Sequence, residues 1–244
     1  MAYNPTSPFQ PETICKILIK SNLLTVYHAK EILRKKDSLL QKLENSRKKK
    51  SENVSANEMI ANPPSIIDVI VSLNLSRQDN PTLPLDEETI FQALAAEWNF
   101  PFYKLDALKL DLNVVTSTIP RNFAMKHLVL PVEVKDGILT VSTPDPFNLE
   151  VLDDISVASK LRVQVVVSPK SEVIKLINEF FGFKRSIVAA QDQFGGSGVD
   201  LGNLEQYVRL SQTDELPSND HHIINAVNHL FMYAFDQKAS DIHI

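Results

Sequence analysis

The feature that most constrains the fold of this 244-residue chain is an apolar pattern that occurs twice. Shifting the sequence by 52 positions lays the first copy over the second. The matched pairs are Ile14 and Ile66, Ile17 and Val69, Leu18 and Ile70, Ile19 and Val71, Asn22 and Asn74, and Leu23 and Leu75. In both copies the apolar residues share one face of a short helix, and the asparagine is a residue type that ends helices.

A longer helix follows each short one. Thr25 is a suitable N-cap for the first long helix and Asp86 for the second, because both side chains offer an oxygen to unpaired backbone N–H groups. An insertion around Asn80-Pro81 raises the shift between the copies to 61. We therefore expect a tail at 1–10 and, at 11–104, a helical subdomain of two helix-pair repeats. The alternative is that two unrelated amphipathic helix pairs look alike.

Residues 105–182 combine helical and strand patterns. Asp136-Gly137 joins two β-rich runs and indicates a hairpin, because glycine tolerates a positive φ. The expected elements are an interrupted helix at 111–126, strands at 128–134 and 138–142, a helix opening at Asp145-Pro146 with Leu149, Leu152 and Ile155 inward, a strand at 161–167, and a helix opening at Ser168-Pro169 and ended by Gly182. From the hairpin onward this is a small β-β-α-β-α module.

The final part of the chain is expected to be a linker and the start of another domain. Five of the six glycines lie between Gly182 and Gly202, which predicts a linker at 183–219. Residues 220–244 read as the first helix and strand of a further, truncated α/β domain. The expected fold class is α+β: a duplicated helix-pair subdomain, the small α/β module, the linker and this further start.

No catalytic, metal or cofactor site emerges from the sequence. Cys15 is the single cysteine and lies on an apolar helix without a neighbouring base. The glycine cluster at 194–198 lacks the Lys-Ser/Thr of a phosphate loop. The acidic runs Asp86-Glu87-Glu88 and Asp153-Asp154 fit helix first turns, and the late histidines lack metal-ligand spacing. We expect a non-enzyme without metal or cofactor. No apolar run approaches the ~20 residues that span a bilayer, so the cytoplasm is the expected location.

Charge is distributed unevenly along the chain. The net charge is −5, yet residues 30–50 contain nine basic and three acidic residues, a local charge of +6. The basic residues are Lys30, Arg34, Lys35, Lys36, Lys42, Arg47, Lys48, Lys49 and Lys50. The run has no interleaved aromatic residues, so we do not expect it to bind nucleic acid. It is either a solvated helix end or a contact with an acidic partner or membrane headgroups. The candidate partner-binding residues are Lys30, Arg34, Lys35 and Lys42.

Four stretches together resemble a known family. They are Leu85-Asp86-Glu87-Glu88 through Leu94-Ala95, Phe100-Pro101-Phe102, Thr140-Val141-Ser142-Thr143-Pro144-Asp145-Pro146, and Ala239-Ser240-Asp241-Ile242-His243-Ile244. From about residue 12 the chain resembles the amino-terminal region of the type II secretion and type IV pilus assembly ATPases, the general secretion pathway protein E family. The sequence ends before any Walker A lysine, Walker B acid or arginine finger, so the resemblance implies a region without ATPase activity of its own.

One branch of that family binds cyclic di-GMP through a duplicated helix-pair motif that starts Arg-Leu-Gly and has a second glycine. By this resemblance Thr13 and Ser65 stand at the arginine positions, Cys15 and Ile67 at the first glycines, and Asn22 and Asn74 at the second glycines. Without the arginines the bidentate, cationic contact with guanine or phosphate is missing. The resemblance therefore implies that the fold is kept and that cyclic di-GMP binding is disfavoured.

The resemblance also implies a function and partners. The expected function is a non-catalytic docking and regulatory region that binds the cytoplasmic parts of inner-membrane platform proteins and positions a homo-hexameric motor. Its expected location is cytoplasmic, peripheral to the inner membrane through those partners. A cyclic di-GMP sensor is the alternative, and a free-standing regulator is a third reading.

Overall fold

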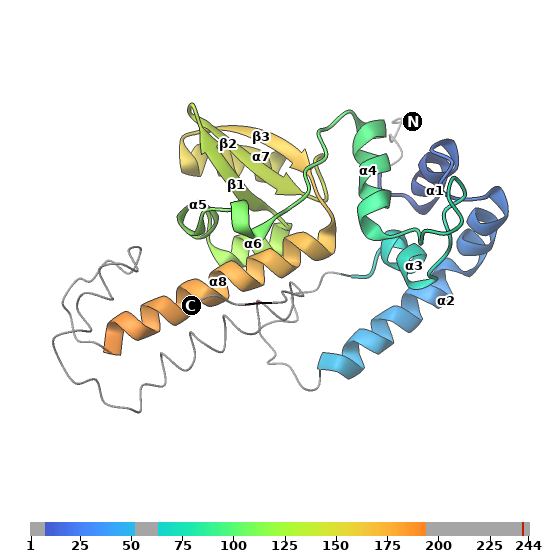
Figure 1. Ribbon diagram of the computed structural model, residues 1–244, viewed down its shortest axis with the longest axis horizontal. Helices are drawn as coiled ribbons and strands as arrows, with labels where there is room; N and C mark the ends of the chain where they lie inside the picture. The colour runs from blue at the N-terminus through green and yellow to red at the C-terminus, as the bar shows by residue number, and fades with distance from the viewer. Residues whose placement is uncertain (1–7, 52–62, 194–240, 242–244) are drawn as a thin grey trace, which may run out of the picture. The chain divides into compact units, whose positions relative to one another are not determined.

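The computed structural model describes residues 8–51, 63–193 and 241 of the chain (Figure 1). The chain divides into two compact units, residues 1–177 and 178–244. The described elements up to Ile177 belong to the first unit. The C-terminal predictions, the linker from residue 194 and the helix and strand at 220–244, lie outside the described residues apart from Asp241.

The first helix pair comprises α1 (Pro11–Lys20) and α2 (Val26–Ser51). Asn22 follows α1 in the left-handed conformation, with φ of 56°. The backbone N–H of Leu23 donates to Leu18 O at 2.9 Å and that of Asn22 to Ile19 O at 3.0 Å, which is the hydrogen-bond pattern of a Schellman ending. Thr25 caps α2 as predicted, because its Oγ1 accepts from the His28 N–H at 3.1 Å.

The second helix pair comprises α3 (Ile66–Ser72) and α4 (Glu87–Trp98). Ser65 and Asp68 form a capping box at the start of α3. Asn74 is left-handed after α3, with φ of 47°, at the position that matches Asn22. Asp86 caps α4 as predicted, accepting from the Thr89 N–H at 2.8 Å. The local signals that end one helix and begin the next therefore recur in both pairs.

The four helices share one hydrophobic core. Its members include the paired positions Leu18 and Ile70, both fully buried, together with Ile32 of α2 and Ile90 and Leu94 of α4. Burying one such aliphatic side chain contributes about 1.5–3 kcal/mol. Leu39, Leu40 and Leu43 of α2 pack against this core but are only partly buried. The apolar residues of α2 are thus buried most completely near its N-terminal end.

The α/β module contains a three-stranded sheet in the order β1-β2-β3. A 3-10 turn η1 (Ala107–Lys109) and the helices α5 (Leu112–Ser117) and α6 (Arg121–His127) precede it. The strands are β1 (Leu130–Lys135), β2 (Ile138–Thr143) and β3 (Arg162–Val167), and α7 (Leu149–Ser159) connects β2 to β3. With α8 (Lys170–Gln193) the order from β1 is β-β-α-β-α, as the sequence predicts (Figure 1).

The hairpin and the crossover set the sheet geometry. Strands β1 and β2 are antiparallel, and Asp136 and Gly137 both have positive φ (51° and 74°), as a type I′ turn requires. Strands β2 and β3 are parallel, which the α7 crossover permits. The β1–β2 register shifts between Pro131 and Glu133, so β1 contains a bulge or similar irregularity.

A short segment before the module completes the outer edge of β3. The Tyr103 N–H donates to Val167 O at 2.8 Å, and the Val167 N–H donates to Pro101 O at 2.8 Å. Ser168 Oγ donates to Tyr103 O at 2.6 Å. Segment 101–103 therefore satisfies the backbone at the end of β3 and connects the helical subdomain to the sheet.

Two predicted helix boundaries are wrong. Asp145 does not cap α7: its Oδ1 accepts from the Phe147 N–H at 3.0 Å in a local turn, and Asn148 is the N-cap. With this later start Leu149 is 67% exposed, so it does not face the core as predicted. Helix α8 also continues through Gly182 to Gln193, because one glycine in a helix interior costs only about 1 kcal/mol relative to alanine. Residues 183–193 of the predicted linker are therefore helical.

Candidate functional site

The four predicted partner-binding residues all lie on α2, and all four side chains are exposed. Glu31 pairs with two of them: Arg34 Nη2 lies 2.9 Å from Glu31 Oε1, and Lys35 Nζ lies 3.3 Å from Glu31 Oε2. These are the i, i+3 and i, i+4 spacings of a helix surface. One carboxylate therefore balances only part of the charge of this basic face, which we define as Lys30, Arg34, Lys35 and Lys42.

The other two members are not balanced locally. Among the described side chains, those of residues 8–46 and 63–184, Lys30 and Lys42 have no ion-pair partner. The neighbouring Lys36 is different, since its Nζ lies 3.2 Å from Glu12 Oε1 of α1 and thus helps to join the two helices. The basic face can offer at least two cations to an acidic group without breaking an existing pair.

The residues near the start of each short helix bear on whether the chain could bind cyclic di-GMP. Cys15 and Ile67, at the predicted first-glycine positions, are 1% and 5% exposed and belong to the helical core. Burial raises the pKa of the Cys15 thiol to about 11, with a smaller contribution from the Glu12 carboxylate. The protonated thiol is a poor nucleophile, in keeping with the structural role expected for Cys15.

Ser65, at the second predicted arginine position, is already engaged. Its backbone N–H and its Oγ both donate to Asp68 Oδ2 at 2.7 Å. Lys170 Nζ lies 3.3 Å from the same oxygen. A carboxylate therefore occupies the immediate surroundings of Ser65, and an anionic ligand there would have to approach it. The sequence pattern did not reveal Lys170, which is far from Asp68 along the chain.

The acidic run Asp86-Glu87-Glu88 has structural roles. Besides the Asp86 cap, Glu88 Oε2 pairs with Lys104 Nζ at 3.0 Å, and Glu87 accepts hydrogen bonds from Ser171. Among the described residues no three His, Cys, Asp or Glu side chains form a group that could hold a metal ion. In the described part of the chain, residues 86–88 thus serve helix capping and contacts between elements.

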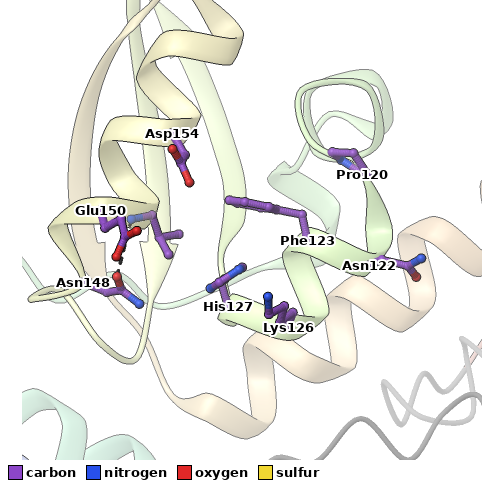
Figure 2. A pocket seen from close by; sticks show the side chains of 9 residues that line it. Pro120, Asn122, Phe123, Lys126, His127, Asn148, Glu150 and Asp154 are labelled. Carbon is purple, nitrogen blue, oxygen red and sulfur yellow. Dashed lines mark hydrogen bonds between the residues drawn. The ribbon is translucent and has the colours of Figure 1, made fainter.

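A pocket of about 620 Å³ lies between α6 and α7. Phe123, Lys126 and His127 line it from α6, and Glu150 and Asp154 from α7. Figure 2 shows the Phe123 ring extending from α6 toward α7. The ring centroids of Phe123 and His127 lie 4.6 Å apart, as their i, i+4 spacing allows. Its lining thus combines two basic side chains with two carboxylates. The sequence analysis missed the pocket, since only the i, i+4 aromatic pair marks it.

Comparison with known proteins shows which proteins this chain is similar to. Residues 98–187 match the model of the MshEN domain. Over 181 residues the chain is 28% identical to the type IV pilus assembly ATPase TfpB of Acinetobacter baylyi, an alignment covering 72% of this chain and 30% of TfpB. The chain thus matches the MshEN domain over residues 98–187 and is homologous to the amino-terminal regions of pilus assembly and secretion ATPases. The resemblance seen in the sequence is thereby confirmed.

Two further similarities are to a secretion protein and to a solved structure. It is 29% identical over 126 residues to the type II secretion system protein E of Xanthomonas campestris, covering 50% of this chain and 20% of that protein. A structure of MshE with cdg (cyclic di-GMP) aligns with a TM-score of 0.41 and 14% identity, covering 68% of this chain and 97% of that one. The chain spans less than a third of the length of TfpB and of the Xanthomonas protein E. No helix among the described residues is long and apolar enough to cross a membrane.

Proposed function

We propose that this chain is the non-catalytic docking and regulatory region of a pilus assembly or secretion ATPase, binding the cytoplasmic parts of inner-membrane platform proteins. In this proposal it works in the cytoplasm, attached to the inner membrane through these partners, and helps to position a hexameric motor. Homology to the amino-terminal regions of such ATPases supports the role.

The basic face of α2 is the surface we assign to this contact. The observation that carries the assignment is its unbalanced charge: Lys30 and Lys42 are exposed and have no ion-pair partner in the described part of the chain. An acidic surface of a platform protein would complement it, and such complementarity raises association rates and selects the correct partner. Because the contact is exposed, salt should weaken it.

Reversing two charges tests the docking surface. Lys30→Glu with Lys42→Glu breaks no described ion pair, so we expect unchanged folding and platform-protein binding that is weaker by about tenfold or more at low salt, given up to about 1 kcal/mol per exposed pair. Fluorescence anisotropy or pull-down with each purified cytoplasmic part measures this. Lys109→Glu with Lys135→Glu changes the net charge equally at exposed positions of the module. Equal losses in both variants, or no binding by any platform protein, would contradict the proposal.

The second candidate is a cyclic di-GMP sensor. The MshEN match and the duplicated helix pair favour it. The residues at the motif positions count against it, because Ser65 is bonded to Asp68 and Cys15 lies in the core. Calorimetric titration with cyclic di-GMP decides between the candidates. A dissociation constant tighter than about 10 μM, roughly −7 kcal/mol, would establish the sensor and displace our preference.

A further inference from the structure

Helix α8 begins without a side-chain cap of its own. Its first intrahelical hydrogen bond runs from the Val173 N–H to Pro169 O at 3.1 Å, which makes Pro169 the N-cap residue. Proline has no side-chain oxygen, whereas the favoured N-cap residues use one to accept from the N–H groups of the first turn. Those N–H groups need an acceptor from elsewhere.

Glu87, the first residue of α4, supplies that acceptor. The Ser171 backbone N–H donates to Glu87 Oε1 at 3.2 Å, and Ser171 Oγ donates to the other carboxylate oxygen. Ser171 is the second residue of α8, where a normal capping side chain would bind. The negative carboxylate also complements the positive end of the helix dipole. Helix α8 is therefore capped by a residue 84 positions away in the sequence.

A second contact joins the same turn to α3. Lys170 Nζ lies 3.3 Å from Asp68 Oδ2 and 3.3 Å from Pro63 O. The two side chains are only 12% and 20% exposed, so solvent screens this pair less than the surface pairs of α2. Asp68 is itself held by the Ser65 capping box. Both helices of the second pair thus hold the first turn of α8 through residues of their own first turns.

We propose that the first turn of α8 is a conditional element that forms only while the second helix pair is in place. Displacing α3 and α4 would remove the Glu87 cap and the Asp68 pair together, and the first turn of α8 would fray. Residues of α8 from Asn178 onward belong to the second compact unit. The first turn of α8, a helix that continues into the second unit, would therefore form or fray together with the second helix pair. This coupling does not depend on whether the α2 face binds a platform protein.

Amide hydrogen exchange of Ser171 to Ile174 tests the proposal in the full chain. Glu87→Ala should speed exchange of these amides by about tenfold or more, and Lys170→Met by a smaller factor. Glu88→Ala is the matched control, because it removes the neighbouring carboxylate of the same helix turn, which pairs with Lys104 and not with α8. Exchange in Glu87→Ala that stays within about twofold of Glu88→Ala would overturn the proposal.

A restored local cap separates capping from general destabilisation. Pro169→Asp provides α8 with an N-cap side chain of its own. In that background Glu87→Ala should change the exchange of the first turn by less than about twofold. An undiminished effect there would show that Glu87 acts by another route and would overturn the proposal. If Glu87→Ala alone does not fold, the same comparison is made with Glu87→Gln, and the same two outcomes decide it.

Discussion

At the scale of single residues, the four positions that the family resemblance assigns to glycines of a cyclic di-GMP motif behave in two ways. Asn22 and Asn74 stand where the motif has glycine, and both adopt positive φ. Asparagine is among the few residues that tolerate this conformation. Cys15 and Ile67, in contrast, place side chains in the core where glycine has none. Two of these four positions thus have a backbone that suits glycine, and the other two carry core side chains.

Cys15 should behave as a protected thiol. Its side chain is 1% exposed and its pKa is raised from 9.0 to about 11. We expect iodoacetamide at pH 8 to alkylate it at least about a hundredfold more slowly in the native protein than in urea, because the thiolate forms only after opening. Mass spectrometry of timed samples measures the rate. Similar rates in the two states would contradict the burial.

The raised thiol pKa also gives a direction for alkaline pH. The folded pKa lies above the unfolded one, so stability is fully present below about pH 9 and falls as the pH rises through about 11. Cys15→Ala should remove this part of the alkaline destabilisation while lowering stability at pH 7. Urea titrations at pH 7 and pH 10.5 compare the two proteins. An unchanged pH dependence in the variant would exclude Cys15 as its source.

At the scale of helices and strands, signals set by adjacent residues were predicted and signals set by distant residues were not. The Thr25 and Asp86 caps and the Asp136-Gly137 turn depend on neighbours in the chain, and each is present. The predicted start of α7 was wrong because an aspartate such as Asp145 can either cap a helix or form a tight turn. The sequence alone does not show which of the two it forms. The basic face was evident from the sequence, whereas the α6–α7 pocket depends on how two helices pack.

The left-handed asparagines give a prediction at this scale. Asn22→Ala should destabilise the protein by about 1 kcal/mol, because alanine pays the full cost of positive φ, whereas Asn22→Gly should be neutral or stabilising. Denaturant unfolding measures both. Ser21 provides the control, since its φ is −80° and glycine there should be worse than alanine. The same order of alanine and glycine at both positions would contradict the assigned conformation.

At the scale of the whole first unit, aromatic contacts join the helical subdomain to the module. The ring centroids of Trp98 in α4 and Phe147 lie 5.4 Å apart, and those of Phe147 and Phe100 lie 5.6 Å apart. Both pairs are arranged edge to face. Such pairs contribute about 0.5–1.5 kcal/mol beyond the area they bury. Together with segment 101–103 they explain why a chain read as two parts, 11–104 and 105–182, is compact as far as Ile177.

Phe147→Ala tests this connection. Phe147 is 41% exposed, so the loss should be about 1–2 kcal/mol, less than for a fully buried phenylalanine. Trp98 is the only tryptophan, and its fluorescence should shift to longer wavelength as its neighbour is removed. Leu149→Ala, at an exposed position two residues away, is the control. An unchanged spectrum together with unchanged stability would show that the aromatic contacts do not join the two parts.

The irregular outer strand β1 has a consequence for solubility. An edge strand with free backbone groups is a template for pairing with other chains, and bulges, prolines and charges on the edge discourage such pairing. Strand β1 has all three: the register shift, Pro131, and the exposed Glu133 and Lys135. Straightening this edge, for example with Pro131→Val and Glu133→Val, would turn it into a nucleus for intermolecular sheets. In the hexamer proposed above, such an edge would discourage pairing between the sheets of neighbouring copies.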